Sequence, residues 1–170
     1  FFEPKRIYNG PFDGDPDRPA VSWASHPKGE VPEGHYTVPI GLAEVVQPGS
    51  ALTIITYGTL VHVAVAAAKT AGVDAEVIDV RSLSPLDETT LTDSVKKTGR
   101  CLIAHEATRF GGYGAELAAI IQKNCFYHLE APVSRVAGWD TPYPHAFEWQ
   151  YFPGKKRMVA GIRRVMETAA

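Results

Sequence analysis

The sequence predicts an α/β domain of three layers, in which helices cover both faces of a mostly parallel sheet of about five strands. Short β-rich apolar runs alternate with amphipathic helical segments from residue 51 onward, which is the pattern of strand–helix–strand units. The first of these runs lacks a strict two-residue alternation, as expected for a strand buried on both faces. Proline and glycine gather before residue 51, so the regular elements are expected after it.

The first half of the alternating part contains two expected strands and two expected helices. Residues 51–57 form a strand ended by Gly58, and 75–80 form the second strand. The helix over 59–71 is expected to end at Gly72, because glycine is favoured at helix C-caps. Asp87 is the expected N-cap of a polar helix that carries Leu91 and Val95. One face of helix 59–71 carries Val61, Ala64, Val65 and Ala68.

The second half repeats the pattern with strands over 101–105 and 133–137. A helix follows Gly111-Gly112, and a last helix is marked by apolar residues near the end of the chain. In a parallel sheet, ligands bind at the carboxyl ends of the strands. The residues expected at that edge are Gly58, His105, Glu106, Gly138, Trp139 and Asp140.

Composition divides the chain into three predicted parts. Residues 1–50 hold eight of the thirteen prolines and six of the fifteen glycines, which favours an extended connecting segment. The sequence starts directly with apolar residues, and residues 1–10 resemble the end of a strand whose parent domain is missing. We therefore expect a truncated chain. We therefore predict a tail over 1–10, a linker over 11–50 and a domain over 51–170.

Charge, hydropathy and cysteine content limit the classes of function. A net charge of −2 gives no electrostatic reason to expect a nucleic acid or an anionic membrane as partner. No apolar run approaches the roughly 20 residues that span a bilayer, and the first residues do not have the order of a signal peptide. Cys101 and Cys125 fit no metal spacing and are expected to be reduced core residues of an intracellular protein.

Two motifs suggest chemistry, and each has a structural alternative. The glycines from Gly111 to Gly114 open a helix after a strand, but Leu117 occupies the third glycine position of a dinucleotide fingerprint. They either hold an anion at the helix start or allow close packing of helix and strand. His105 and Glu106 have side chains suited to acid–base work, but neighbours on a strand point to opposite faces. A structural or subunit-contact role is therefore favoured for this pair.

A stiff loop over residues 140–148 combines aromatic side chains, two prolines and polar groups. Such loops form binding surfaces or cover the end of a sheet. The sequence shows no nucleophile elbow, zinc-binding helix or cysteine cluster. We therefore expect no catalytic, cofactor-binding or metal-binding residue in this chain.

Several segments in order resemble the β subunits of the E1 component of 2-oxo acid dehydrogenases. Two of them, His105-Glu106-Ala107 and Asp140–His145, are most similar to the branched-chain (2-oxoisovalerate) type. The pyruvate or acetoin type is the alternative within this family. The segments are Phe2–Tyr8, His35–Gly41, Thr56–Thr59, Asp79–Asp87, His105–Ala107, Leu129–Pro132 and Asp140–His145.

The resemblance implies a transketolase C-terminal-like domain that is inactive alone. It implies thiamine diphosphate with Mg in an intact α2β2 enzyme, none bound to this fragment, and decarboxylation of a branched 2-oxo acid with reductive acylation of E2 lipoyl groups. The implied partners are the E1 α subunit, a second β subunit and the subunit-binding domain of the E2 acyltransferase. The bacterial cytoplasm, or the mitochondrial matrix in a eukaryote, is the implied location.

The residues assigned to partner binding are Glu130, which the resemblance places at the E2 contact, and Asp140, His145 and Glu148 in the loop. His105 and Glu106 are assigned to a subunit interface or channel. Two rival hypotheses stay open: an independent flavodoxin-like module that binds a flavin or nucleotide, and a dimerisation domain without E2 contact.

Overall fold

The computed structural model describes residues 1–3 and 32–168, and these contain a five-stranded sheet in the order β1-β3-β2-β4-β5. Strands β3, β2, β4 and β5 are parallel to one another, and β1 is antiparallel to β3. The prediction of a mostly parallel sheet of about five strands is confirmed. The strands are β1 (Glu44–Gln47), β2 (Leu52–Thr56), β3 (Ala75–Asp79), β4 (Cys101–Thr108) and β5 (Ser134–Gly138).

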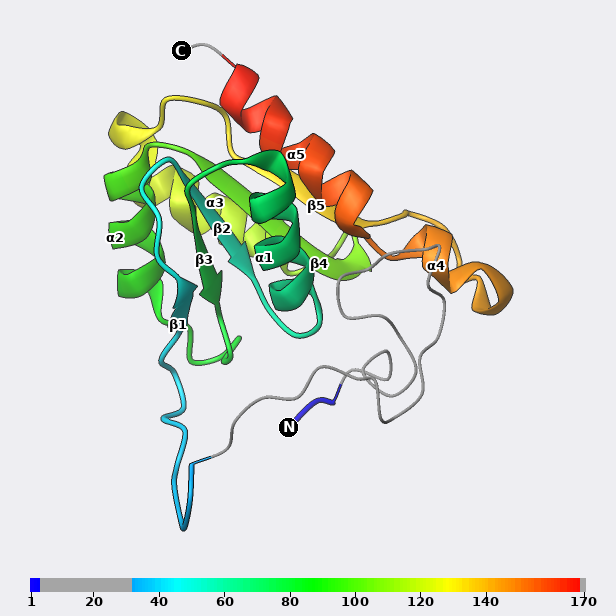
Figure 1. The fold of residues 1–170 in the computed structure, drawn as a ribbon, viewed down its shortest axis with the longest axis horizontal. Helices are drawn as coiled ribbons and strands as arrows, with labels where there is room; N and C mark the ends of the chain where they lie inside the picture. The colour runs from blue at the N-terminus through cyan, green and yellow to red at the C-terminus, as the bar shows by residue number, and fades with distance from the viewer. Residues whose placement is uncertain (4–31, 169–170) are drawn as a thin grey trace.

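Helices cover both faces of the sheet, as predicted for a three-layer domain (Figure 1). Leu60 and Val63 of α1 join Met158 and Ile162 of α5 in the core of one face. Helices α2 and α3 supply the core of the other face, with residues such as Leu91. The helices are α1 (Leu60–Ala71), α2 (Glu88–Thr98), α3 (Gly114–Cys125), α4 (Glu148–Tyr151) and α5 (Lys155–Glu167).

Two predicted helix ends are confirmed by their hydrogen bonds. Gly72 adopts a left-handed φ of 67° and its amide donates to the carbonyls of Ala68 and Lys69, which closes α1. The Asp87 carboxylate accepts from the amide of Thr90 at 3.1 Å and so caps α2. These caps determine where α1 ends and where α2 begins, and therefore where the loops between these helices and β3 lie.

Strand β1 comes from the range that the sequence assigned to the linker. It pairs with β3 through Glu44 and Asp79, so the sheet begins before the predicted boundary at residue 51. Val45 and Val46 are both exposed, and the pairing with β3 is irregular between Val45 and Gln47. Of the predicted tail over 1–10, only the first three residues are described.

Both cysteines are free and fully buried, as expected of core residues. Cys101 begins β4 and Cys125 ends α3, and both belong to the core on the α2–α3 side of the sheet. Burial raises the pKa of each thiol, which keeps both protonated at neutral pH. The structure therefore gives neither cysteine the exposed, thiolate-favouring setting of a reactive thiol.

Candidate functional site

The carboxyl edge of the sheet gathers polar side chains between β2 and β4. The chain leaves β2 toward β3 on one side, and β4 leads to β5 on the other, so this is the switch point where ligands bind in open α/β sheets. The Thr59 hydroxyl, at the start of α1, donates to the Glu106 carboxylate of β4. The Tyr57 ring stacks on His105 with centroids 6.3 Å apart.

His105 is fully buried beneath the start of α3. Its Nδ1 lies 3.1 Å from the Ala107 carbonyl, whereas its buried Nε2 has no hydrogen-bond partner within the described ranges. Burial lowers the pKa of His105, and the nearby Arg135 charge acts in the same direction. The ring is therefore neutral at pH 7, with its proton on Nδ1, and serves as a packing group.

The glycines before α3 make room for this ring. A Cβ on Gly114 would lie 2.3 Å from Nε2 of His105, and one on Gly112 would lie 2.7 Å from Cε1. The turn thus lets helix and strand approach closely, which favours the packing interpretation over an anion-binding loop. Glu106 is contacted from α1, on the other face of the sheet, so the expectation that His105 and Glu106 point to opposite faces is confirmed.

Two tyrosines complete the switch point, and both stay protonated. Burial raises the pKa of Tyr57 to about 12, with smaller contributions from Tyr113 and Glu106. Burial likewise raises the pKa of Tyr113, whose hydroxyl donates to the Leu83 carbonyl at 2.6 Å. The edge therefore combines a neutral imidazole, two phenols and a hydrogen-bonded carboxylate, an arrangement that holds loops in place but lacks an activated nucleophile.

The loop after β3 is fixed to both neighbours. Arg81 has a φ of 55°, a left-handed conformation that side chains rarely adopt. Its guanidinium forms an ion pair with Glu44 of β1, and its amide donates to the half-buried Asp79 carboxylate. With the Tyr113 hydrogen bond, this loop joins the edge strand to α3 across the carboxyl side of the sheet.

The four residues assigned to partner binding do not lie together. Glu130 precedes β5, at the amino edge of the sheet, and forms an ion pair with Arg100 at 2.7 Å. Its side chain is 54% exposed and that of Arg100 is 23% exposed, so the pair borders solvent. A docking partner would meet Glu130 already paired with a cation.

Asp140 and His145 lie beyond the other end of β5. Asp140 accepts from the amide of Phe110 at 2.7 Å and lines an open pocket of about 380 Å³ with Arg109 and Arg135. The exposed ring of His145 contacts Tyr143 edge-on, with centroids 5.0 Å apart. Glu148 begins α4, so the predicted loop 140–148 ends in helical turns.

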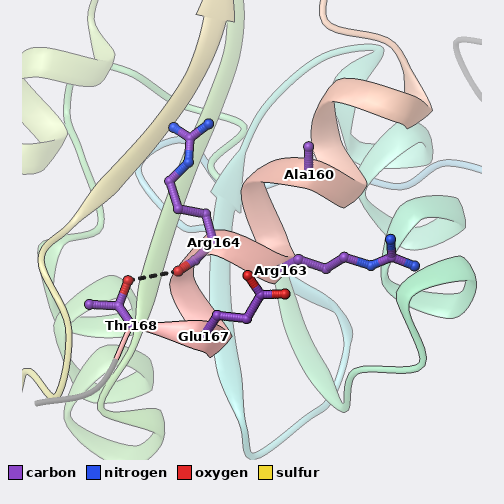
Figure 2. A pocket seen from close by; sticks show the side chains of 5 residues that line it. All are labelled: Ala160, Arg163, Arg164, Glu167 and Thr168. Carbon is purple, nitrogen blue, oxygen red and sulfur yellow. Dashed lines mark hydrogen bonds between the residues drawn. The ribbon is translucent and has the colours of Figure 1, made fainter.

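Another open pocket, of about 490 Å³, lies on the outer surface of the last helix. Figure 2 shows that Arg163 and Arg164 extend in different directions from α5, with Glu167 between them. The Thr168 hydroxyl donates to the Arg164 carbonyl at 2.7 Å, which closes the helix end. This hollow is lined by exposed side chains and holds no buried polar group suited to catalysis.

The described residues do not fit thiamine diphosphate and its magnesium ion. Magnesium needs carboxylate or other oxygen ligands that converge on one point. Across residues 1–3 and 32–168, no group of three or more His, Cys, Asp or Glu side chains could hold a metal ion. We therefore assign no step of thiamine chemistry to these residues.

In the same part of the chain, residues 1–3 and 32–168, no helix is long and apolar enough to cross a membrane.

Sequence reasoning missed three contributors to the carboxyl edge: Thr59, Tyr57 and Tyr113. Each lies next to a glycine that follows a strand, and that position is the signal that could have selected them. Arg81 gave no such signal, because a left-handed conformation is not expected of arginine.

Fold and site together define a doubly wound α/β domain whose switch point is filled by its own side chains. The family model for the transketolase C-terminal domain matches residues 41–158. The chain belongs to this family.

Curated relatives and a solved structure agree with this assignment. The chain is 63% identical over 167 residues to the 2-oxoisovalerate dehydrogenase subunit beta of Pseudomonas aeruginosa, covering 98% of the chain and 48% of that protein. It is 43% identical over 171 residues to the 3-methyl-2-oxobutanoate dehydrogenase subunit beta of Mycobacterium tuberculosis, covering 98% and 44%.

One solved structure with a similar fold is an inactive β4 tetramer of a split-gene transketolase, with a TM-score of 0.67 and 25% identity over 85% of this chain and 47% of that one. The chain thus spans about half the length of the curated relatives it matches.

Proposed function

We propose that this chain is the C-terminal part of the β subunit of a branched-chain 2-oxo acid dehydrogenase, and that it acts in assembly rather than in chemistry. The observation that carries the proposal is the 63% identity to a 2-oxoisovalerate dehydrogenase β subunit over 98% of the chain. The 3-methyl-2-oxobutanoate enzyme of Mycobacterium tuberculosis supports the same substrate class. The whole enzyme would decarboxylate the branched 2-oxo acid and acylate the lipoyl group of E2.

The geometry of the carboxyl edge supports a scaffold role. At this edge His105 is neutral and enclosed, Glu106 is hydrogen-bonded to Thr59, and Tyr57 is protonated. Thiamine diphosphate with Mg belongs, in this proposal, to the intact α2β2 enzyme. His105 and Glu106 stay proposed subunit-interface or channel residues.

The proposed partners are the α subunit, a second β subunit and the E2 subunit-binding domain. For E2, the best-supported contact is Glu130, because its carboxylate is half-exposed and already arranged around a cation, Arg100. A basic side chain of E2 would then join or replace Arg100. Asp140, His145 and Glu148 form a separate proposed contact beyond β5. The proposed location is the cytoplasm of a bacterium, or the mitochondrial matrix in a eukaryote.

Reconstitution of the enzyme tests this proposal. The full-length β polypeptide, coexpressed with its α subunit and supplied with E2, thiamine diphosphate and Mg, should oxidise 3-methyl-2-oxobutanoate at least about tenfold more efficiently than pyruvate. The 170-residue chain alone should show no turnover and no calorimetric binding of thiamine diphosphate. A preference for pyruvate would refute the branched-chain assignment, and tight cofactor binding by the short chain would refute the assembly role.

A further inference from the structure

Four exposed apolar side chains lie around the start of the family-matched domain. We define the arm as residues 36–42. Residues 35–39 belong to no helix or strand, and residues 40 and 41 form a turn. The apolar members of the arm are Tyr36, Val38, Ile40 and Leu42, with exposed fractions of 50%, 54%, 83% and 51%.

The end of the arm next to β1 is held by a hydrogen bond to the start of α2. Directly after it, the amide of Ala43 donates to the Asp87 carboxylate at 3.0 Å, and a turn with a φ of 85° at Gly41 starts the outward run. From there the arm runs away from the sheet and the helices (Figure 1). Its base is therefore placed by α2, whereas its apolar side chains meet solvent.

Further exposed apolar side chains lie on the neighbouring edge of the sheet. Val45 and Val46 of β1 and Leu83 of the next loop are each more than one-third exposed. Among residues 1–3 and 32–168, strand β1 pairs with β3 alone, so within this part of the chain its other edge has no partner. Large exposed apolar patches mark interfaces in soluble proteins.

The length of the relatives supports one occupant for the arm, the part of the β polypeptide that this chain does not include. The family match begins at residue 41, so most of the arm lies before the matched domain, and the chain covers 48% of the Pseudomonas β subunit, a polypeptide about twice as long. A surface on the same chain has a high effective concentration compared with one on a separate molecule. We propose that the arm docks on the preceding half of its own β polypeptide and holds the two halves in a fixed arrangement, an inference that rests on the proposed full-length organisation.

Photocrosslinking in the full-length polypeptide, assembled with its α subunit, tests this inference. Benzoylphenylalanine is placed at Ile40, and the matched control carries it at Tyr127, which is 93% exposed in the turn after α3. Mixed isotope-labelled and unlabelled β chains separate crosslinks within one chain from crosslinks between chains. We expect an intrachain product in which residue 40 is joined to a peptide from the preceding half, with a yield at least about fivefold above the control.

The other outcomes overturn the inference. A mixed-label product would assign the arm to a second copy, a product with the α subunit would assign it to that chain, and a yield equal to that of Tyr127 would show that the arm stays in solvent. As a second measurement, Val38→Ser with Ile40→Ser should raise amide exchange in the arm at least about tenfold in the full-length protein. Unchanged exchange would also refute docking. Dehydrogenase activity is measured separately, so the proposed function can fail while the intrachain crosslink persists.

Discussion

The contact between Gly114 and His105 gives the sharpest test of the carboxyl edge. In Gly114→Ala, the new methyl group would lie 2.3 Å from Nε2 and 2.4 Å from Cδ2 of a fully buried ring, and 3.3 Å from Cγ2 of Ile103. The ring has no free space to enter, because a Cβ on the neighbouring Gly112 would also meet it, at 2.7 Å. The start of α3 must therefore move away from β4.

Overpacking of this kind destabilises a core by about 1–3 kcal/mol, and the short distances place this variant at the upper end. Alanine in place of glycine returns at most about 1 kcal/mol of helix propensity. We therefore expect a net loss of about 2 kcal/mol, or a decrease in Tm of about 4–8 °C for a chain of this size. Urea unfolding followed by circular dichroism measures the loss directly.

A double-mutant cycle identifies the ring as the cause. His105→Ala removes the obstacle, so Gly114→Ala should be much less destabilising in that background, with a coupling energy of about 1–2 kcal/mol. If Gly114→Ala changes the free energy of unfolding by less than about 0.5 kcal/mol, or if the two effects simply add, His105 does not occupy the glycine turn and the packing interpretation is wrong.

Three further predictions concern other parts of the domain. Burial raises the pKa of Asp87, but hydrogen bonds from Thr90 and Ala43 outweigh this effect, so the pKa in the folded protein is lowered. The ionised Asp87 carboxylate therefore stabilises the folded protein above about pH 4. This stabilisation is lost as the pH falls through the lowered pKa. Asp87→Asn should flatten the acid side of a stability–pH profile, and an unchanged profile would contradict this cap. Thr53→Val removes hydrogen bonds of 2.7 and 2.8 Å to two α2 hydroxyls and should cost about 1–2 kcal/mol in urea unfolding, whereas a neutral result would mean that these hydroxyls find other partners. In the assembled enzyme, Glu130→Lys should weaken calorimetric binding of the E2 subunit-binding domain about tenfold while Glu116→Lys on α3 leaves it unchanged, and equal affinity would remove Glu130 from the proposed contact.

Local signals in the sequence were sufficient for the regular elements of the domain. Gly72 and Asp87 marked helix ends correctly, because capping depends on backbone groups only a few residues away. Strand β1 escaped prediction because it has four residues and no buried face, so it lacks the apolar pattern that revealed β2. Its place in the sheet depends on pairing with β3, some thirty residues later.

The candidate site was only partly predictable for a similar reason. The position of His105 and Glu106 at a strand end followed from the strand–helix pattern. The partner of Glu106 did not, because Thr59 is 47 residues away in the sequence and the two meet only when β2 and β4 become neighbours. The filling of the glycine turn by His105 likewise depends on the distance between α3 and β4, which sequence spacing does not determine.

The two buried thiols make it possible to measure how often the domain opens. Cys101 and Cys125 face the same core layer from a strand and a helix, so a maleimide reaches either one only when the α2–α3 side separates from the sheet. Labelling rates measured at increasing reagent concentration would report how often this layer opens in the assembled enzyme, without any engineered probe. A binding partner that makes the α2–α3 side open less often would slow the labelling by the same factor.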